Sequence, residues 1–362
     1  MKDSYEIAVV PGDGIGPEVC YAAVAALRAL YGNDTPLHFS EYPAGADIFR
    51  RTGESFPETT FQGCRQADAI LHGAAGIPGV VHPDGTEAGL DFTLRLRFEL
   101  DLFANIRPIR LYSGVNSPLR GVKPGQIDYV ILRENSEGLY AARGAGSQLR
   151  GEVAVDTLVQ TRKGVERIVR RAFDLARASD GAPADGVRRV TCVDKANVLR
   201  SYAFFRSIFD EVAPDYPDIE AEHGLIDAMA MYLVTRPGHY NVIVTENMFG
   251  DILSDLAAAT IGGMGLAASA EVGLAQGLFQ AAHGSAPDIA GKGIANPYGT
   301  MLSAAAMLDW LGNRHADRRL SDGAERLRAA VEGAIADGHL SRDLGGTGSS
   351  SAIVVEVCRR LN

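Results

Sequence analysis

The sequence predicts an α/β fold, because short apolar runs alternate with glycine-rich turns and helical segments. The first such unit joins a strand at residues 7–10, the turn PGDGIGPEV and an Ala- and Leu-rich helix to about residue 31. The chain has 362 residues, of which 46% are hydrophobic. This length and composition allow a large core and predict two domains.

Further elements follow in the same alternation. Strands are expected at 67–72, 129–132, 190–193 and 242–244, and helices at 89–100, 163–177, 225–233 and from 250 onward. Residues 141–162 are glycine-rich and then alternate, which predicts an extended arm. A final pair of helices flanks LGGTGSS. Since no linker divides the chain, the second domain is expected to be inserted into the first.

Charge and cysteine content exclude several classes of protein. A net charge of −10 argues against a general binder of nucleic acid or anionic membranes. The four cysteines are far apart and form no CxxC pair, so neither a zinc finger nor a disulfide framework is indicated. There is no run of about 20 apolar residues to span a bilayer. We expect a cytoplasmic protein.

The stretch YNVIVTENMFGDILSDL at 240–256 carries a pair of carboxylates. Asp251 and Asp255 lie four residues apart on the predicted helix, so they share one face with Cβ atoms ~5–6 Å apart. Aspartate oxygens are the ligands that Mg²⁺ or Mn²⁺ prefers, whereas a solvated acidic helix face is the commoner meaning of this spacing. Taken alone, the pair of aspartates does not distinguish a metal site from a solvated helix face.

The glycine-rich turn at 11–18 is weak evidence for a dinucleotide site. Gly12, Gly14 and Gly16 alternate, so the lettering matches GxGxxG only loosely. An acidic residue ending a second strand about 20 residues on is not evident either. The ordinary Rossmann interpretation is therefore rejected.

Other candidate residues gather at the ends of predicted elements. Arginine suits bidentate binding of carboxylates, and a partly buried lysine can act as a base. A glycine-rich loop can approach phosphates, while its carboxylate accepts hydrogen bonds from ribose hydroxyls. Taken singly, each arginine is more often a member of a surface ion pair, and the other candidates have equally ordinary interpretations as an interface aromatic or a surface loop. The candidates are Arg97, Arg107, Arg133, Tyr140, Lys195, Asp227, His283 and Asp288.

Seven motifs together resemble the isocitrate and isopropylmalate dehydrogenase family of β-decarboxylating dehydrogenases. The resemblance covers essentially the whole chain. The motifs are PGDGIGPE at 11–18, LRFELDLFANIRP at 96–108, RENSEGLY at 133–140, VDKANVL at 193–199, IDAMAM at 226–231, ENMFGDILSDLAA at 246–258 and HGSAPDIAGKGIANP at 283–297. Seven motifs in the right order make a chance match negligible.

The resemblance implies a sandwich of two α/β domains. Residues 1–102 and 258–362 would form a larger, cofactor-binding domain. Residues 103–257 would form a smaller inserted domain that carries the dimer interface and the arm. The resemblance also implies a homodimer in which each active site draws residues from both subunits, with a small dicarboxylate as the only other partner.

The resemblance assigns a role to each candidate residue. Arg97, Arg107 and Arg133 match the arginines that hold the malate carboxylates. Tyr140 matches the tyrosine that protonates carbon after CO₂ departs, and Lys195 the lysine that helps remove the hydroxyl proton. Asp227, Asp251 and Asp255 match the carboxylates that bind Mg²⁺ or Mn²⁺, with Lys195 and Asp227 given to the neighbouring subunit.

The cofactor implied is NAD. A carboxylate at Asp288 suits two free ribose hydroxyls and would repel a 2′-phosphate, and NADP-using relatives place Lys and Tyr where this chain has Asp288 and Ile289. The positions implied to bind the cofactor are Ile15, His283, Gly284, Ser285, Ala286, Asp288 and Asn296.

The expected substrate is a 3-substituted malate, with 3-isopropylmalate, an intermediate of leucine biosynthesis, as the best single prediction. Isocitrate-using relatives carry Ser and Asn where this chain has Asp91 and Thr93, and Asp91 is expected to repel a third carboxylate. Isopropylmalate users have two adjacent leucines where this chain has Thr93 and Leu94, and usually read ELTGG in place of ENSEG at 134–138.

Several alternatives stay open. Tartrate-using relatives share the ENSEG lettering but tend to lose the first arginine, kept here as Arg97, so tartrate or D-malate is the runner-up. Isocitrate and homoisocitrate are less favoured. A non-catalytic regulatory subunit would typically lack members of the metal and Tyr/Lys set, all of which are present.

Overall fold

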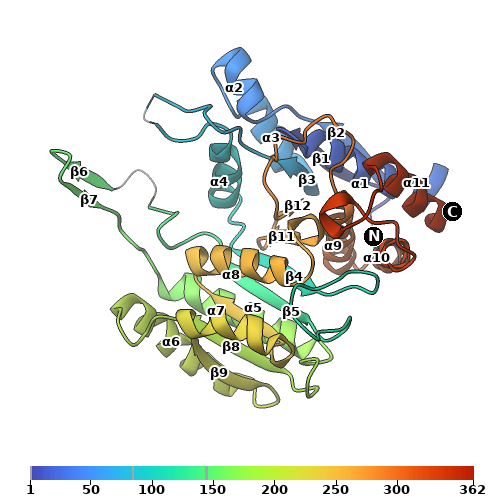
Figure 1. Ribbon diagram of the computed structural model, residues 1–362. Coiled ribbons are helices and arrows are strands. Elements are labelled where there is room, and N and C mark those ends of the chain that lie inside the picture. The colour runs from blue at the N-terminus through green and yellow to red at the C-terminus, as the bar shows by residue number, and fades with distance from the viewer. Residues whose placement is uncertain (1, 84, 143–145) are drawn as a thin grey trace. The chain divides into compact units, whose positions relative to one another are not determined.

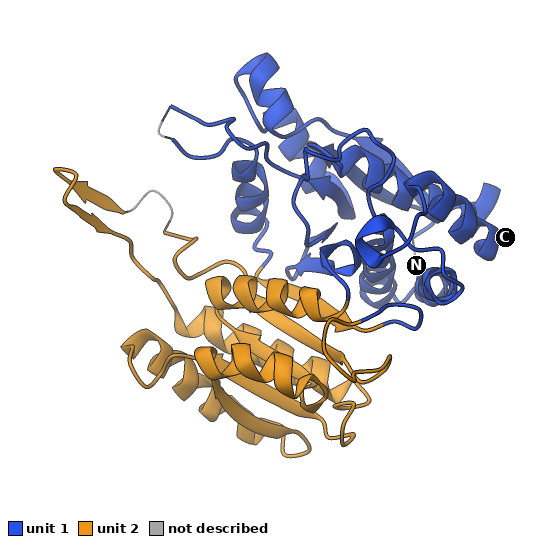
Figure 2. Ribbon diagram, viewed as in Figure 1, with its two compact units in different colours: residues 1–102, 112–116, 262–362 blue, residues 103–111, 117–261 orange. Residues whose placement is uncertain are grey.

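The computed structural model describes residues 2–83, 85–142 and 146–362, and within them the chain forms two compact units (Figure 1, Figure 2). Unit 1 comprises residues 1–102, 112–116 and 262–362, and unit 2 comprises residues 103–111 and 117–261. The predicted domain boundary at 258 lies inside a helix that ends at Thr260, so the chain re-enters unit 1 only at residue 262. No helix among the described residues is long and apolar enough to span a membrane.

Unit 1 is built on five strands, four of them parallel. The strand order is β2-β1-β3-β12-β11, in which β12 and β11 pair antiparallel. The strands are β1 (Tyr5–Gly12), β2 (Leu37–Glu41), β3 (Ala69–Ala74), β11 (Ala268–Val272) and β12 (Gly277–Ala281). The helices are α1 (Gly16–Tyr31), α2 (Ala46–Thr52), α3 (Glu58–Gln66), α4 (Leu90–Glu99), α9 (Tyr298–His315), α10 (Arg318–Ala336) and α11 (Ser350–Leu361).

Unit 2 repeats this plan with its own five strands. The order is β4-β5-β10-β8-β9, with only the β4–β5 pair antiparallel among these described strands. The strands are β4 (Ala104–Arg110), β5 (Asp128–Glu134), β8 (Arg189–Asp194), β9 (Glu220–Leu225) and β10 (Val242–Thr245). The helices are α5 (Arg162–Arg177), α6 (Arg200–Val212), α7 (Ile226–Thr235) and α8 (Asn247–Thr260).

Burial explains why these segments adopt their structures. All six residues of β3 and all six of β8 are buried, as expected for parallel strands covered on both faces. In α5 the apolar residues Val165, Ile168, Val169, Ala172 and Phe173 recur every three or four positions and are fully buried. Each unit therefore holds a helix-covered, largely parallel sheet.

A two-stranded hairpin projects from unit 2 (Figure 1). Its strands β6 (Ser147–Leu149) and β7 (Val153–Val155) pair antiparallel, and all six of their residues are exposed. The hairpin occupies the middle of the arm expected at 141–162, of which residues 143–145 lie outside the described residues. The apolar side chains of Leu149, Val153 and Val155 are 59%, 49% and 51% exposed.

Candidate active site

In unit 2, two buried arginines meet two aspartates. Arg107 comes from β4 and Arg133 from β5, with side chains 8% and 1% exposed. Arg133 pairs with Asp251, and Arg107 lies 3.3 Å from Asp251 and 3.5 Å from Asp255. Both aspartates stand one turn apart on α8, as the sequence predicts. The positive and negative charges of the four side chains balance.

Sheet order brings these residues together. Strand β10 lies parallel to β5 with Thr245 opposite Arg133, and α8 begins directly after β10. The carboxyl ends of parallel strands share one edge of a sheet, where α/β proteins place their ligands. Glu246 fixes the start of α8, because its carboxylate accepts hydrogen bonds from the backbone N–H groups of Met248 and Phe249.

Three further α8 residues hold the arginines, and the sequence analysis missed them. The Asn247 side-chain oxygen accepts from Arg133 Nε at 2.9 Å and Nη2 at 2.7 Å. Ser254 Oγ accepts from Arg107. At Gly250 an added Cβ would lie 2.6 Å from the Cβ of Arg133, so the arginine stem packs directly on the helix backbone. The motif ENMFGDILSDL contains all three residues, but nothing in the sequence alone indicates that they contact the arginines.

Tyr140 joins this cluster. Its hydroxyl lies 3.3 Å from Asp251 Oδ2, and the Arg133 guanidinium carbon lies 5.6 Å from its ring centre. Burial, followed by the nearby charge of Asp251, raises the pKa of Tyr140. A raised pKa keeps the phenol protonated, which is the form a proton donor requires.

Lys195 and Asp227 form a separate pair in unit 2. Lys195 follows β8 and Asp227 lies in the first turn of α7, with Nζ 2.7 Å from Oδ1. The hydrogen bond from Lys195 lowers the pKa of Asp227. Among the described residues no three His, Cys, Asp or Glu side chains come together as a metal-binding group. Within one chain, Asp227 is therefore not gathered with Asp251 and Asp255.

In unit 1, helix α4 presents two different faces. Phe92 and Leu96 pack into the apolar core, whereas Leu90, Leu94 and Arg97 lie on another face at helical spacing. Leu90 is 40% exposed. Arg97 forms a bidentate ion pair with Glu271 of β11.

Two side chains of this helix are already engaged within unit 1. Thr93 is 8% exposed and its hydroxyl donates to the carbonyl of Leu90 at 2.8 Å. The Asp91 carboxylate accepts from the backbone of Gly89 at 2.8 Å, while Ser55 Oγ and His82 Nε2 also contact it. Asp91 thus fixes the start of α4 through these contacts, a role that the sequence did not indicate.

The predicted cofactor loop at 283–296 lies against the turn after β1. The Ile15 N–H donates to the Ser285 carbonyl at 2.8 Å, and Ile15 packs with Ala286, Ile289 and Ala295. A Cβ at Gly14, where φ is +59°, would lie 2.0 Å from the Ser285 carbonyl oxygen. Only glycine permits this close approach of two backbones.

Polar groups of the loop suit a dinucleotide. Gly284 and Asp288 are exposed. Burial lowers the pKa of His283, whose Nε2 is buried and has no hydrogen-bond partner among the described residues. Asn296 bridges Asp343 and the backbone of Tyr298, each at 3.0 Å. An imidazole nitrogen without a partner, an exposed carboxylate and accessible backbone in one loop fit a ligand rich in hydroxyls and phosphates.

Asp13 organises the same region, although the sequence analysis gave it no role. It is 1% exposed, and its carboxylate accepts from the backbone N–H groups of Ala46, Asp47 and Gly76 at 2.8–3.0 Å. A carboxylate with three backbone donors is strongly held. Its position between two glycines in PGDGIG is the one sequence feature that could have indicated this role.

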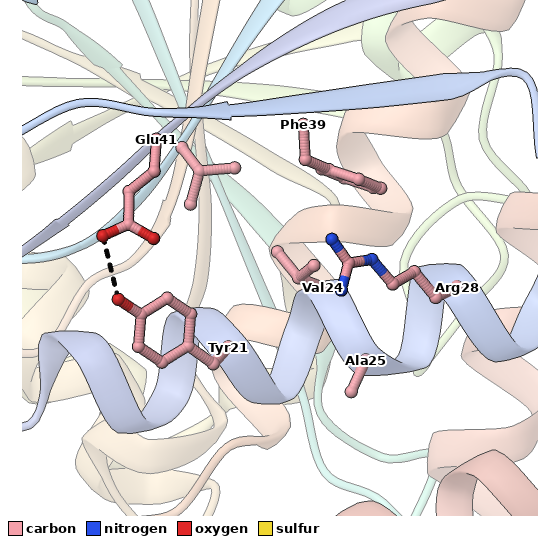
Figure 3. A pocket seen from close by; sticks show the side chains of 7 residues that line it. Tyr21, Val24, Ala25, Arg28, Phe39 and Glu41 are labelled. Carbon is pink, nitrogen blue, oxygen red and sulfur yellow. Dashed lines mark hydrogen bonds between the residues drawn. The ribbon is translucent and has the colours of Figure 1, made fainter.

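A groove elsewhere in unit 1 is not part of this arrangement. It lies between α1 and β2, has a volume of about 520 Å³ and is lined by Val9, Tyr21, Val24, Ala25, Arg28, Phe39 and Glu41 (Figure 3). Tyr21 donates to Glu41 at 3.0 Å. None of the predicted site residues, all of which the structure describes, lines it.

Known proteins match the chain over nearly its full length. The family described as isocitrate/isopropylmalate dehydrogenase matches residues 6–357. The chain belongs to the isocitrate/isopropylmalate dehydrogenase family. It is accordingly a dehydrogenase, an oxidoreductase, as the seven motifs predicted.

Individual relatives of this dehydrogenase fall in the same family. The 3-isopropylmalate/3-methylmalate dehydrogenase of Methanocaldococcus jannaschii is 44% identical over 358 residues, covering 99% of each chain. The 3-isopropylmalate dehydrogenase of Corynebacterium glutamicum (strain R) is 41% identical, covering 96% of this chain and 98% of its own. The crystal structure of isocitrate dehydrogenase from Methylococcus capsulatus is 36% identical, with a TM-score of 0.86 and 99% of each chain covered.

A solved β-decarboxylating dehydrogenase from Thermococcus kodakarensis, in its apo form, is 40% identical. Its TM-score is 0.77, and 99% of this chain and 96% of that chain are covered. These neighbours confirm the predicted α/β fold of the dehydrogenase.

Proposed function

We propose that this dehydrogenase catalyses the NAD- and metal-dependent oxidative decarboxylation of a 3-substituted (R)-malate. The proposed substrate is 3-isopropylmalate, and the products are 4-methyl-2-oxopentanoate and CO₂, which places the enzyme in leucine biosynthesis. The observation that carries the proposal is the full-length identity of 41–44% to relatives named 3-isopropylmalate dehydrogenase. The complete set of Tyr140, Lys195 and aspartates supports a catalytic rather than a regulatory chain.

The residues present fit a divalent cation. Burial is the main cause that raises the pKa of Asp255, and the negative charge of Asp251 adds to it. A cation bound at these carboxylates would favour their charged forms and so oppose both causes of the raised pKa. When bound, Mg²⁺ or Mn²⁺ would polarise the substrate oxygen, and NAD would accept the hydride from C2. Asp251 and Asp255 would hold the metal together with Asp227 of a second copy of the chain.

The chain's own side chains would bind substrate and move protons. Arg97, Arg107 and Arg133 would take the malate carboxylates. Lys195 would help remove the C2 hydroxyl proton. Tyr140, kept protonated by its raised pKa, would deliver a proton to the carbon from which CO₂ has departed. Leu90, Thr93 and Leu94 on α4 would line the wall against the C3 substituent.

A homodimer with shared sites forms part of the proposal. Apolar side chains are exposed on two neighbouring helices, with Met231 and Val234 of α7 at 53% and 42% and Ile252 of α8 at 58%. The hairpin of β6 and β7 adds further exposed apolar residues. Such surfaces are typical of subunit interfaces. The dimer would act in the cytoplasm.

Tartrate or D-malate is the second candidate, favoured by the ENSEG lettering at 134–138. The Thr93 hydroxyl could pair with a hydroxyl of tartrate, but it already donates to the Leu90 carbonyl. Product analysis tests the proposal. Incubation of the purified protein with 3-isopropylmalate, NAD and Mn²⁺ should yield NADH, CO₂ and 4-methyl-2-oxopentanoate in equal amounts.

The same incubation carries its own control. A chelator should stop all three products, and added Mg²⁺ or Mn²⁺ should restore them. Undiminished turnover in metal-free protein would contradict the metal's role. NADH formed without CO₂ would contradict decarboxylation.

A further inference from the structure

The head group of Arg97 is held in place from within its own unit. Nε lies 2.7 Å from Glu271 Oε2, and Nη2 lies 2.7 Å from Glu271 Oε1. The Arg97 side chain is 11% exposed and that of Glu271 is fully buried. Two parallel charge-assisted hydrogen bonds fix both the position and the plane of a guanidinium.

Glu271 is itself restrained by the neighbouring strand. Gln280 of β12 donates from Nε2 to Glu271 Oε1 at 2.8 Å. In the antiparallel β11–β12 pair, Glu271 lies opposite Leu278 and Ser269 opposite Gln280. Gln280 is thus a diagonal neighbour, a distance that long side chains span. Three hydrogen-bond donors, two from α4 and one from β12, therefore fix the position of the Glu271 carboxylate.

The charges of Arg97 and Glu271 cancel. The nearby His72 adds no positive charge, because burial lowers its pKa to about 4 and leaves the imidazole neutral. A buried carboxylate requires a partner, and Arg97 supplies the cation for Glu271. An incoming anion therefore meets a fixed, neutralised pair at Arg97 rather than a full unit of positive charge.

We propose that Glu271 is a positioning residue for substrate binding. It fixes the Arg97 guanidinium in place and partly neutralises its charge. The bidentate pair uses the Nε–Nη2 edge, so Glu271 sets the plane in which the Arg97 guanidinium would meet a substrate carboxylate. Pre-organised donors favour the transition state, whereas a stronger mobile charge favours ground-state binding. Glu271 thereby trades substrate affinity for turnover.

The location of Arg97 on α4 links the positioning of its guanidinium to substrate specificity. Thr93 and Leu94 lie four and three residues before Arg97 on α4, so their side chains neighbour its stem. Any movement of the guanidinium would therefore occur next to the residues proposed to contact the C3 substituent. This inference rests on the proposed function.

Glu271→Gln tests it, since the amide retains one acceptor but removes the charge. We expect KM for 3-isopropylmalate and kcat both to fall by about tenfold, the effect of roughly one charge-assisted hydrogen bond. KM should also become more sensitive to salt, because the site carries one more positive charge. A purely structural role would lower the melting temperature and move none of these three quantities in the folded enzyme.

Asp317→Asn is the matched control in the same unit. Asp317 is likewise fully buried and paired with an arginine, Arg319, but is none of the predicted site residues. It should lower stability and leave KM, kcat and salt sensitivity unchanged. If Glu271→Gln fails to fold, Gln280→Leu removes one of the two donors to Glu271 Oε1 and should change KM and kcat in the same direction by less.

Calorimetric titration with 3-isopropylmalate separates the two proposals. Wild-type protein that binds 3-isopropylmalate, together with a Glu271→Gln variant that binds it more tightly, supports the positioning role. Equal binding and equal kinetics in wild type and both variants would overturn that role and leave the proposed function standing. Wild-type protein that neither binds nor turns over a 3-substituted malate would overturn the function and the inference with it.

Discussion

Glu134 is a buried carboxyl next to Arg133, and it links the site to pH. It is 2% exposed and accepts hydrogen bonds from the backbone N–H groups of Ser136 and Glu137. Burial is the main cause that raises its pKa from 4.5 to about 7. The folded state therefore holds this proton more tightly than the unfolded state, and ionisation at higher pH destabilises the fold.

Glu134→Gln should flatten the pH dependence of stability. In wild type this carboxyl should reduce the free energy of unfolding by about 3 kcal/mol as pH rises from below 4.5 to above 7. Urea unfolding at about pH 5 and about pH 8 measures the difference. Glu54→Gln, at an exposed site, controls for the chemical change. An unchanged pH slope in Glu134→Gln would refute this account of Glu134.

Asp288 should determine the choice of cofactor. Its side chain is exposed in the loop that meets Ile15, where a carboxylate would accept from ribose hydroxyls and repel a 2′-phosphate. The variant Asp288→Lys with Ile289→Tyr should shift the ratio of kcat/KM for NAD and NADP toward NADP. Asp288→Asn, which removes only the charge, should shift it less. Equal use of NADP by the wild type would show this interpretation of Asp288 to be wrong.

At the scale of elements, helix α4 should set the substrate preference. Thr93 is buried with its hydroxyl tied to Leu90, so Thr93→Leu adds apolar volume and removes a polar atom. We expect kcat/KM for 3-isopropylmalate relative to tartrate to rise by about tenfold, since each buried CH₂ contributes roughly 0.8 kcal/mol. Thr93→Val, which replaces the hydroxyl with a methyl group at nearly constant volume, should give a smaller rise. An unchanged ratio in both variants would mean that Thr93 faces away from the substituent.

The elements show what the sequence could predict. Periodic, strongly apolar segments were located to within about a residue, since α4 begins at Leu90, one residue after its predicted start, and α5 ends at Arg177 as predicted. The motifs assigned Arg133 and Asp251 to one active site, but they did not predict that the two side chains pair with each other. The pairing of Arg97 with Glu271 could not be predicted, because 174 residues separate the two and only strand order brings them together.

Asp91 shows that charge alone indicates only part of a residue's role. The sequence placed it as a repulsive wall against a third carboxylate. In the structure its carboxylate is engaged by Ser55, His82 and the Gly89 backbone. The structure thus gives Asp91 a part in fixing the start of α4, and its repulsion of a third carboxylate stays a prediction.

At the scale of the whole molecule, the proposed sharing of active sites predicts complementation between inactive variants. Lys195 and Asp227 pair with each other in this chain, which suits residues that serve a second copy. Mixed dimers of Tyr140→Phe and Lys195→Ala should regain activity, because one hybrid site then has both residues intact. Dimers of Lys195→Ala with Asp227→Ala are the control and should stay inactive, since each site lacks one of the two. No recovery from demonstrated Tyr140→Phe/Lys195→Ala heterodimers would argue against shared sites.

The central claim is that the enzyme oxidises and decarboxylates a malate with an apolar 3-substituent. The most direct measurement is kcat/KM, followed by NADH absorbance with NAD and Mn²⁺, for 3-isopropylmalate, 3-methylmalate, D-malate, tartrate, isocitrate and homoisocitrate. Burial of three substituent carbons should favour 3-isopropylmalate over D-malate by ~2 kcal/mol, or about thirtyfold. We predict that 3-isopropylmalate gives the highest value and exceeds isocitrate by a wide margin. A value for isocitrate or tartrate equal to or above that for 3-isopropylmalate would contradict the account.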